Sequence, residues 1–502
     1  MQSQKILIVV VFKLFKYGLS FVFFYLMVSF YTPNIIGTVQ FAIAFVAIFS
    51  FIFNLGFSVA HLKIYPEEKN KPACIGTLLV YKGFFIFLSL IFYFSLLYFI
   101  NLETVIMTIL LIFIFEQIIQ SINNSLSNIL IADNEILKGS FPWIIISLSK
   151  IFLLVIGLFL LHTNEITLSF IYLISTLFHT GFLFIYIIPY KIKKPTTELL
   201  KKYLKFTYPL TFSNITVLIS GNIGIILIKF WMSPEAVAFY YAGDHLSVFR
   251  TIIPNVISMV MLSIFSRNIN QNNYEKNKQF IKKFSKYFSI LWGGIIILSF
   301  SYSDEFIILL LGETYSPSIF VFNILILTQI IVINDIAVLT DLNAKGLTKL
   351  FSLIKIIGEI YNIFLIFLFI APFGLNLGIN GLALSILFRY LTFTPIIRFY
   401  LWLKYKYKYN FGIFLYLSAA LIVYLINSLY TSSFDLLNQF YLIPIFIILD
   451  IALYCGILFI LRVIKKEDLK YFKQFLNIKS LVKLLYEDLA IKENKSKGKN
   501  VS

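Results

Sequence analysis

Charged side chains are scarce in this 502-residue sequence, and their scarcity decides the class of protein. Only 13% of the residues are Asp, Glu, Lys or Arg, whereas 59% are apolar and 18% are aromatic. Soluble globular domains usually contain about 25% charged residues. The composition therefore excludes an ordinary soluble protein and places the chain among integral membrane proteins.

Cysteine and histidine are also rare, and their positions argue against a metal site or a disulfide framework. The two cysteines, Cys74 and Cys455, lie far apart, and the four histidines show no ligand spacing. The sequence contains no GxxxxGK[ST] phosphate-binding loop, so we do not expect this chain to hydrolyse ATP. We therefore predict no metal and no other cofactor.

Long apolar runs recur along the whole chain. We expect the first run to be a permanent helix rather than a cleaved signal peptide, because Lys13 and Lys16 interrupt it. A membrane-spanning helix needs about 20 apolar residues. On this criterion we expect fourteen spans, at 8–32, 35–60, 75–100, 104–131, 141–162, 165–189, 206–232, 236–266, 284–311, 315–342, 347–371, 377–402, 411–430 and 440–463.

The positions of the basic residues predict the orientation of these spans. Lysines and arginines gather in alternate loops, at 190–205, 267–287 and 398–410, whereas the loops between them contain neither residue. Basic loops of membrane proteins face the cytoplasm. The net charge of +18 therefore reflects membrane topology rather than nucleic-acid binding. We expect a multi-pass protein of the plasma (inner) membrane with both termini in the cytoplasm.

Two stretches of the sequence occur twice. Pro33 and Gly37 in SFYTPNIIGTVQ match Pro234 and Ala238 in KFWMSPEAVAFYYAGDH. In addition, QIIQSINNSLSNILIADNEILKG resembles QIIVINDIAVLTDLNAKGLTK further along the chain. Six expected spans, an even number, separate each pair, so both copies have the same orientation. The pattern predicts two parallel six-helix bundles related by an axis along the membrane normal, with the substrate between them.

The expected fold class is thus an all-α integral membrane protein. Its units are an N-terminal six-helix bundle, a basic cytoplasmic linker, a second six-helix bundle, an additional helix pair and a basic cytoplasmic tail, at 1–189, 190–205, 206–402, 411–463 and 464–502. Apolar residues in the tail fit a short helix on the anionic inner leaflet, and a solvated tail fits as well.

Three longer motifs carry a family resemblance. They are SPEAVAFYYAGDHLSVFRTIIPNVISMVMLSIFSR, GETYSPSIFVFNIL and APFGLNLGINGLALSIL. These motifs resemble regions of polysaccharide flippases in the MATE-like multidrug/oligosaccharidyl-lipid/polysaccharide superfamily. Ala238 departs from the family, which usually has glycine there. The resemblance implies a transporter, not an enzyme, that moves a lipid-linked oligosaccharide across the bilayer.

Ionisable residues at membrane depth are candidates for the substrate site. Each such charge costs about 2.5–3.5 kcal/mol unless it has a partner or a water-filled cavity. Arg250, Arg389 and Lys229 could bind a diphosphate group. The two arginines could instead pair with Asp244 or Asp335. Two other charges have simple explanations, because Lys355 is placed to pair with Glu359 one turn away and Lys16 to reach the cytoplasmic surface.

A polar stripe marks the expected span at 104–131. Glu116, Gln120 and Asn123 follow one another at helical spacing. Their side chains could bind sugar hydroxyls, or they could hold neighbouring helices together. Glu116, Asp244 and Asp335 are also the candidates for a coupling H+ or Na+.

We therefore expect a flippase that moves a polyprenyl diphosphate-sugar from the inner to the outer leaflet by alternating access, for cell-surface polysaccharide or glycan assembly. Its partners would be the lipid-linked oligosaccharide, membrane lipids and polysaccharide assembly enzymes. A cation-coupled drug antiporter of the same superfamily is the alternative, although such antiporters usually have twelve spans. A lipid II flippase also fits the number of spans. A membrane enzyme is disfavoured because the longest outer segment, 302–318, is short.

Overall fold

The computed structural model describes residues 2–53, 55–99, 103–160, 163–271, 273–407, 412–431, 434, 436 and 439–463. Within these ranges the chain forms helices and no β-strand. Thirteen of the described helices are long and apolar enough to cross a membrane. The expected all-α, multi-pass membrane fold is confirmed. The tail expected at 464–502 lies outside the described residues.

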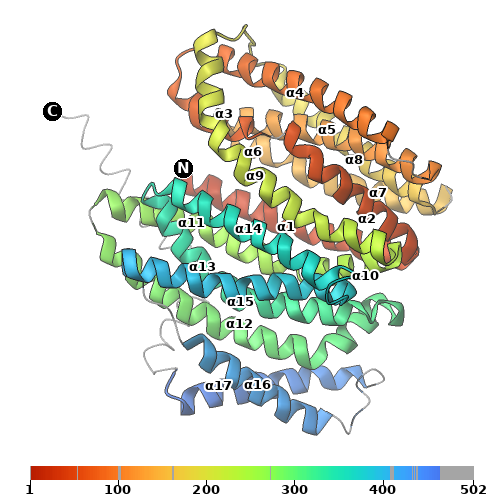
Figure 1. Cartoon of the computed structure of the whole chain (residues 1–502), viewed down its shortest axis with the longest axis vertical. Helices are drawn as coiled ribbons and strands as arrows, with labels where there is room; N and C mark the ends of the chain where they lie inside the picture. Colours follow the sequence, from red (N-terminus) through yellow and green to blue (C-terminus); the bar gives the residue numbers. More distant parts are fainter. Residues whose placement is uncertain are drawn as a thin grey trace.

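Most helices of the first half form the upper group in Figure 1, where α9 (Thr197–Trp231) of the second half joins them, while α1 (Gln2–Phe30) runs through the middle of the molecule. The elements of the first half are α1, α2 (Pro33–Phe49), α3 (Phe57–Ile64), α4 (Lys71–Phe99), α5 (Thr104–Ala132), α6 (Ile136–Ser140), α7 (Pro142–Leu160) and α8 (Glu165–Ile187), with two 3-10 turns, η1 (Ser50–Ile52) and η2 (Tyr65–Glu67).

The second half begins with a 35-residue helix, α9, and ends with a helix pair at the edge of the molecule farthest from α4 (Figure 1). Its elements are α9 (Thr197–Trp231), α10 (Pro234–Leu246), α11 (Phe249–Asn270), α12 (Tyr274–Leu311), η3 (Glu313–Tyr315), α13 (Ser318–Ala344), α14 (Thr348–Ile370), α15 (Gly378–Tyr405), α16 (Gly412–Thr431), η4 (Phe440–Leu442) and α17 (Ile443–Ile460).

The span expected at 236–266 is divided. Helix α10 ends at Leu246 and α11 starts at Phe249, and the hydroxyl of Ser247 donates to the carbonyl of Asp244 at 2.8 Å. The span expected at 35–60 is interrupted in a similar way, since α2 gives way to η1 and then α3. Both halves therefore break their second helix. The sequence analysis did not predict either break, although polar residues stand at both, Asp244 and Ser247 in one and Asn54 in the other.

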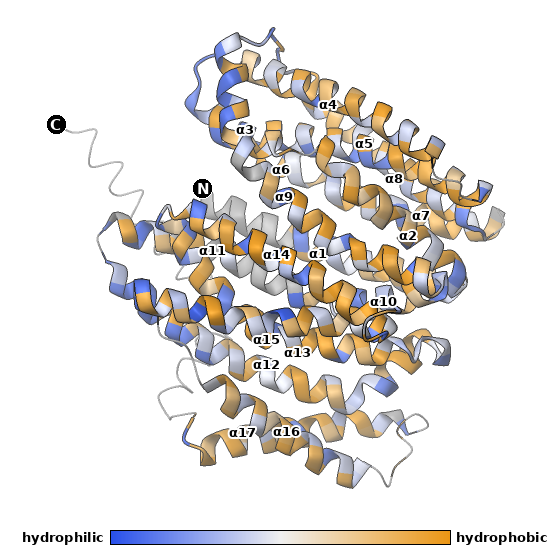
Figure 2. Ribbon diagram, in the orientation of Figure 1, coloured by the Kyte–Doolittle hydropathy of each residue, from blue (hydrophilic) through white to orange (hydrophobic). Residues whose placement is uncertain are grey.

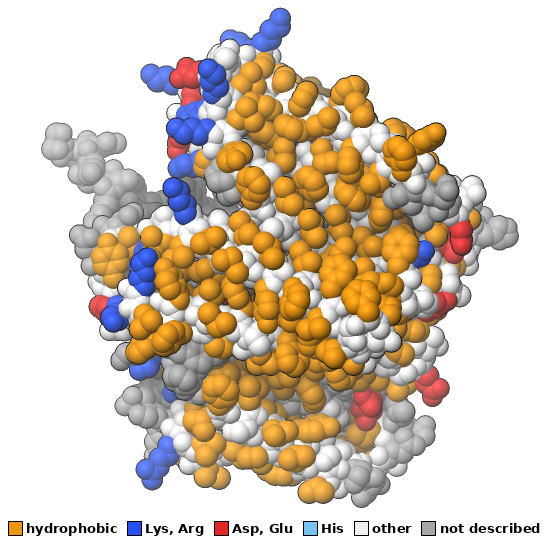
Figure 3. All heavy atoms as spheres, in the orientation of Figure 1, with side chains coloured by type: hydrophobic (Ala, Val, Ile, Leu, Met, Phe, Trp, Pro, Cys, Tyr) orange, Lys and Arg blue, Asp and Glu red, His pale blue; other side chains and the backbone are white. Residues whose placement is uncertain are grey.

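The two ends of the helices differ in charge. On the face shown in Figure 3, Lys and Arg side chains gather at one end, and Asp and Glu side chains predominate at the other. We call the first the basic end and the second, where Pro33 and Pro234 start their helices, the corner end. Between them, most residues along the helices are hydrophobic (Figure 2), and hydrophobic side chains cover most of the face shown in Figure 3. This distribution fits a protein surrounded by lipid.

Polar contacts replace apolar ones at several points of the interior. Asp450 of α17 is fully buried and accepts hydrogen bonds from Tyr302 at 2.6 Å and Asn427 at 2.9 Å, and from Tyr430. These contacts attach α17 to both α16 and α12. Burial of apolar surface does not drive helix association in lipid, so such hydrogen bonds hold the helix pair in place.

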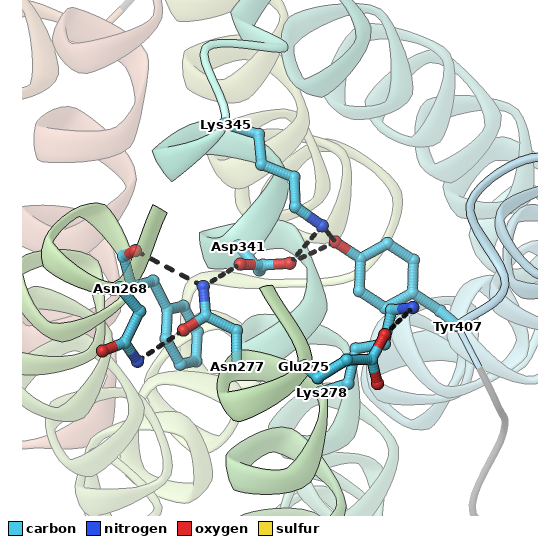
Figure 4. Close-up of polar contacts among 8 residues, drawn as sticks. Asn268, Glu275, Asn277, Lys278, Asp341, Lys345 and Tyr407 are labelled. Carbon is cyan, nitrogen blue, oxygen red and sulfur yellow. Dashed lines mark hydrogen bonds and ion pairs between the residues drawn. The ribbon is translucent and has the colours of Figure 1, made fainter. Parts of the chain in front are cut away.

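Matching clusters close the basic end of each half. Asp341, near the end of α13, pairs with Lys345 at 2.7 Å, accepts from Asn277 at 2.7 Å and accepts from Tyr407 (Figure 4). Asn277 in turn accepts from Asn268 at 2.8 Å (Figure 4).

In the first half, Asp133 after α5 pairs with Lys71 at 3.0 Å and accepts from Tyr65 and Tyr190 at 3.2 and 3.1 Å. Burial alone would raise the pKa of Asp133, but the Lys71 ammonium and the two hydroxyls lower it below its ordinary value. The two repeated stretches thus end in the same arrangement, an aspartate held by a lysine and a tyrosine.

Candidate functional site

The two repeated corners lie against each other. Asn34 of α2 donates from Nδ2 to Oε1 of Glu235 of α10 at 2.6 Å. One turn along α2, Gly37 packs directly on the backbone of Pro234, so closely that a Cβ on Gly37 would lie 1.7 Å from the Pro234 carbonyl oxygen. No other residue fits at position 37 without separating the helices. The sequence predicted that the corner recurs but not that its two copies touch.

Lys229, one of the three expected cations, lies at the same end. Its Nζ is 5.1 Å from the centroid of the Phe41 ring of α2 and 5.0 Å from that of Phe230. The two rings meet edge to face at 5.6 Å. Lys229 therefore sits where α9 of the second half packs on α2 of the first, in a cation–π arrangement.

Arg250 spans the break between α10 and α11. Its guanidinium is 2.5 Å from Asp244, and its Nε donates to the hydroxyl of Ser247 at 3.0 Å. The pairing with Asp244 is the alternative that the sequence left open. The pair is open to its surroundings on one side, because 43% of the Asp244 side chain is exposed, against 16% for Arg250.

Arg389 of α15 pairs with Glu359 of α14. The contact is bidentate, at 2.7 and 3.2 Å, and both side chains are largely buried. The expected pairing of Glu359 with Lys355 does not form, and Lys355 lies 4.8 Å from the centroid of the Phe351 ring. The planar fork of an arginine matches a carboxylate better than a lysine does, which explains why Glu359 takes this partner.

Asp335 of α13 pairs with a residue that the sequence analysis counted with a basic loop. Arg398 lies within α15, which continues to Tyr405, and its Nε is 2.8 Å from Asp335. Thr394 also donates to Asp335 at 2.8 Å. No spacing in the sequence could identify this pair, because its partners lie on helices far apart in the chain.

The polar stripe of α5 faces α8, inside the first half. Glu116 is buried and accepts from the hydroxyl of Thr176 at 2.8 Å. Asn123 donates to the backbone carbonyl of Thr176 at 3.2 Å and lies 3.4 Å from Nδ1 of His179. Within the described part of the chain, the amide oxygens of Gln120 and Asn123 have no hydrogen-bond partner. The stripe thus retains unused binding capacity.

Two lysines complete this region. Lys150 of α7 interacts electrostatically with Glu116, and its Nζ is 3.9 Å from the centroid of the Tyr172 ring. Lys16 of α1 lies 4.4 Å from the centroid of the Trp143 ring. Sequence reasoning placed Lys16 close to the cytoplasmic surface and recognised Lys150 as a charge at membrane depth without assigning it a role. Trp143 was missed, although helical spacing places it on the same face of α7 as Lys150.

The cations of the two halves have different partners. In the second half, Arg250, Arg389 and Arg398 each pair with a carboxylate, whereas in the first half Lys150 interacts with both Glu116 and Lys16. The residues that the structure describes contain no group of three or more His, Cys, Asp or Glu that could hold a metal ion.

A family model described as polysaccharide biosynthesis protein matches residues 3–269. This range contains the first of the three resembling motifs, and the other two lie beyond it. A comparison with curated protein sequences found no match.

Solved structures share the fold over most of the chain. The lipid II flippase MurJ, in an inward closed conformation, is 17% identical, with 90% of this chain and 99% of that chain covered and a TM-score of 0.74. A multidrug resistance MATE family transporter of the MOP superfamily, in an inward-facing conformation, is 13% identical over 77% of this chain and 93% of that chain, with a TM-score of 0.64. A MOP superfamily transporter from Pyrococcus furiosus is 13% identical over 79% and 94%, with a TM-score of 0.58.

Proposed function

This chain belongs to the polysaccharide biosynthesis protein family, and on that premise we propose that it carries a lipid-linked oligosaccharide, a polyprenyl diphosphate-sugar, from the inner to the outer leaflet. Its family and its fold are those of membrane transporters rather than enzymes. The oligosaccharide would then be used outside for cell-surface polysaccharide or glycan assembly, with the assembly enzymes as partners.

The observation that carries the mechanism is the contact between the two corners. Asn34 with Glu235, and Gly37 with Pro234, join the two halves at the corner end. Helix α2 also packs along α10 and α9, so the whole of this helix interface, and not the corner contact alone, would part when the corner end opens. Alternating access requires such a reversible seal, with the two halves rocking so that one end opens as the other closes.

Cations in the second half are suited to the diphosphate. Arg250, Arg389 and Lys229 are the candidates, and both arginines at present bind carboxylates. A substrate phosphate would take the place of Asp244 or Glu359 on the guanidinium. Glu116, Gln120 and Asn123 offer acceptors and donors to sugar hydroxyls, and the free amide oxygens of Gln120 and Asn123 support that role.

A coupling ion would act on the same carboxylates. Each of these carboxylates interacts with a cation. Asp244 pairs with Arg250, Asp335 pairs with Arg398, and Glu116 interacts electrostatically with Lys150. Protonation of Asp244, or Na+ binding there, would release Arg250 for the substrate. This exchange would link the movement of H+ or Na+ to that of the anionic lipid.

The charged ends support the orientation. We infer that the basic end faces the cytoplasm, that both termini lie there and that the membrane is the plasma (inner) membrane. The gathering of Lys and Arg at one end (Figure 3) follows the positive-inside rule.

The proposal is tested by reconstitution. The purified protein is placed in liposomes that contain a fluorescent lipid-linked oligosaccharide, and an added impermeant quencher measures how much of it reaches each leaflet. Faster equilibration than in empty liposomes supports the proposal. Equilibration at the rate of empty liposomes contradicts it. The fold is shared with MATE transporters and a lipid II flippase, so cationic dyes and lipid II are tested in parallel.

A further inference from the structure

Four helices of the first half bring their polar side chains to one place. On α5 the residues are Glu116 and Asn123, on α7 Trp143 and Lys150, and on α8 Tyr172, Thr176 and His179, with Lys16 from α1. On α5 and on α7 the two residues are seven positions apart, and on α8 the three residues are spaced by four and three positions. Each set therefore lies on one helical face. We call these eight residues the first-half polar cluster.

Direct contacts join the members of this cluster. Glu116 binds Thr176 at 2.8 Å, and one turn away Tyr172 lies under the Lys150 ammonium. The Trp143 ring lies 4.4 Å from Lys16 and 4.8 Å from the ring of His179. His179 in turn contacts Asn123. The cluster is continuous from α1 to α8.

The charges in the cluster do not balance. Lys16 and Lys150 are both cations, and Glu116 is the one carboxylate among the eight residues. Lys150 interacts with Glu116 and is repelled by Lys16, and no ion pair found in the described part of the chain involves either lysine. Every arginine of the buried pairs in the second half, by contrast, is within 2.8 Å of a carboxylate. An unbalanced charge at membrane depth is costly.

Unused hydrogen-bonding atoms surround the same residues. Asn123 and His179 are both fully buried, and among the residues that the structure describes, Oδ1 of Asn123 and Nε2 of His179 have no hydrogen-bond partner. Buried polar groups are normally satisfied. A ligand or water that reached the cluster would therefore gain hydrogen bonds as well as compensating charge.

We propose that the first-half polar cluster is an anion site in which Lys16 and Lys150 bind the acidic part of the substrate head, and that Glu116 holds the place of that anion when the site is empty. The anion is either the diphosphate or the carboxylate of an acidic sugar. The rings of Trp143 and Tyr172 lie against the two ammonium groups and hold them in place. This inference rests on the proposed function, which names the anionic lipid as substrate.

The test measures binding rather than transport. The full-length protein in nanodiscs is titrated calorimetrically with farnesyl diphosphate and, separately, with glucuronate. We expect one of the two to bind. Lys16→Met and Lys150→Met should each weaken that binding by about tenfold or more, the effect of a lost charge-assisted contact. Glu116→Gln should tighten it by about tenfold, because the internal competitor is removed.

Matched variants guard against unfolding. Lys355→Met removes a lysine that also lies over an aromatic ring at membrane depth but is outside the cluster, and it should leave binding unchanged. Lys150→Arg should weaken binding less than Lys150→Met. Thermal unfolding of each variant shows that it is folded. A second readout comes from Trp143, since its fluorescence should change on binding and the change should vanish in Trp143→Phe.

Three results would overturn the inference: neither probe binds, both lysine variants bind like the wild type, or Glu116→Gln weakens binding as much as Lys150→Met. The last result would make Glu116 a direct ligand. Binding of glucuronate alone assigns the site to an acidic sugar. If the wild type flips the lipid but the lysine variants bind the probe as well as the wild type does, this inference alone is wrong. If binding depends on the lysines but the wild type does not flip the lipid, the proposed function alone is wrong.

Discussion

The side chains of Asn34 and Glu235 lie 201 residues apart in the sequence and 2.6 Å apart in the structure. Each occupies the position directly after the proline that starts its helix, so the hydrogen bond joins the two copies of a repeated corner. The repeat therefore has a structural consequence beyond duplication. The same corner, used twice, gives two surfaces that meet at the corner end.

Enlarging Gly37 should open this end. A Cβ at position 37 would lie 1.7 Å from the carbonyl oxygen of Pro234, so Gly37→Leu has to push α2 and α10 apart. The opening is measured with a single cysteine at position 238, buried in the closed corner, in a protein lacking Cys74 and Cys455. An impermeant maleimide should label this cysteine faster in the Gly37→Leu variant than in the protein that keeps Gly37.

The matched control is Gly181→Leu. A Cβ at position 181 would meet nothing within 4 Å, so this substitution adds the same bulk without forcing helices apart. Labelling at position 238 should stay at the original rate. Equal labelling in Gly37→Leu and Gly181→Leu would show that the corner contact does not control access.

Arg250→Ala should reduce transport by about tenfold or more while leaving the amount of protein in the membrane normal. The expected cause is loss of a phosphate ligand that Asp244 now occupies at 2.5 Å. Exchange of the two charges, Asp244→Arg with Arg250→Asp, separates binding from structure. If the pair only holds the helix break together, the exchanged protein transports normally. That result would exclude Arg250 from substrate binding.

Arg389→Ala should have a similar effect, and Arg389→Lys should be intermediate. The bidentate contact at 2.7 and 3.2 Å uses the guanidinium fork, which lysine lacks. Rates are compared in liposomes with Lys355→Met as the control for a lost cation in the same region. Full activity of Arg389→Ala would exclude Arg389 from substrate binding.

Asp450→Leu should loosen the helix pair α16–α17. The substitution removes the acceptor of the Tyr302 and Tyr430 hydroxyls, and an unsatisfied buried donor costs about 1–3 kcal/mol. The midpoint of thermal unfolding should fall, and it should fall less in Asp450→Asn, which keeps an acceptor. Equal midpoints in all three proteins would show that Asp450 does not anchor the pair.

The sequence was sufficient for the all-α, multi-pass fold, because long apolar runs depend on local composition, although fourteen spans were expected and thirteen candidates are found among the described residues. Apolar runs produced thirteen long helices, and the bias of Lys and Arg appears at one end (Figure 3). The break at Ser247, where the serine hydroxyl donates to the carbonyl of Asp244, was missed because the expected span was read as one continuous helix. Helix limits also shifted, and α9 and α12 begin inside the loops expected at 190–205 and 267–287.

The site was harder to predict than the fold. The residues at membrane depth were identifiable from their charge alone, but their partners were not. Glu359 has Lys355 one turn away in the sequence, yet it pairs with Arg389, 30 residues distant on the next helix. Helix packing decides such choices, and one sequence contains no direct record of it. The contact between Asn34 and Glu235 is of the same kind.

The most direct measurement is the sidedness of the lipid-linked glycan in cells depleted of this protein. Intact cells are treated with an impermeant lectin or glycan-cleaving enzyme. A flippase predicts that the precursor accumulates on the inner leaflet, protected from the probe, while surface glycan is lost. A variant with cysteines at positions 34 and 235 can be locked in the closed-corner state by a disulfide. It should show the same phenotype until the disulfide is reduced. Unchanged glycan sidedness after depletion would contradict the proposed function.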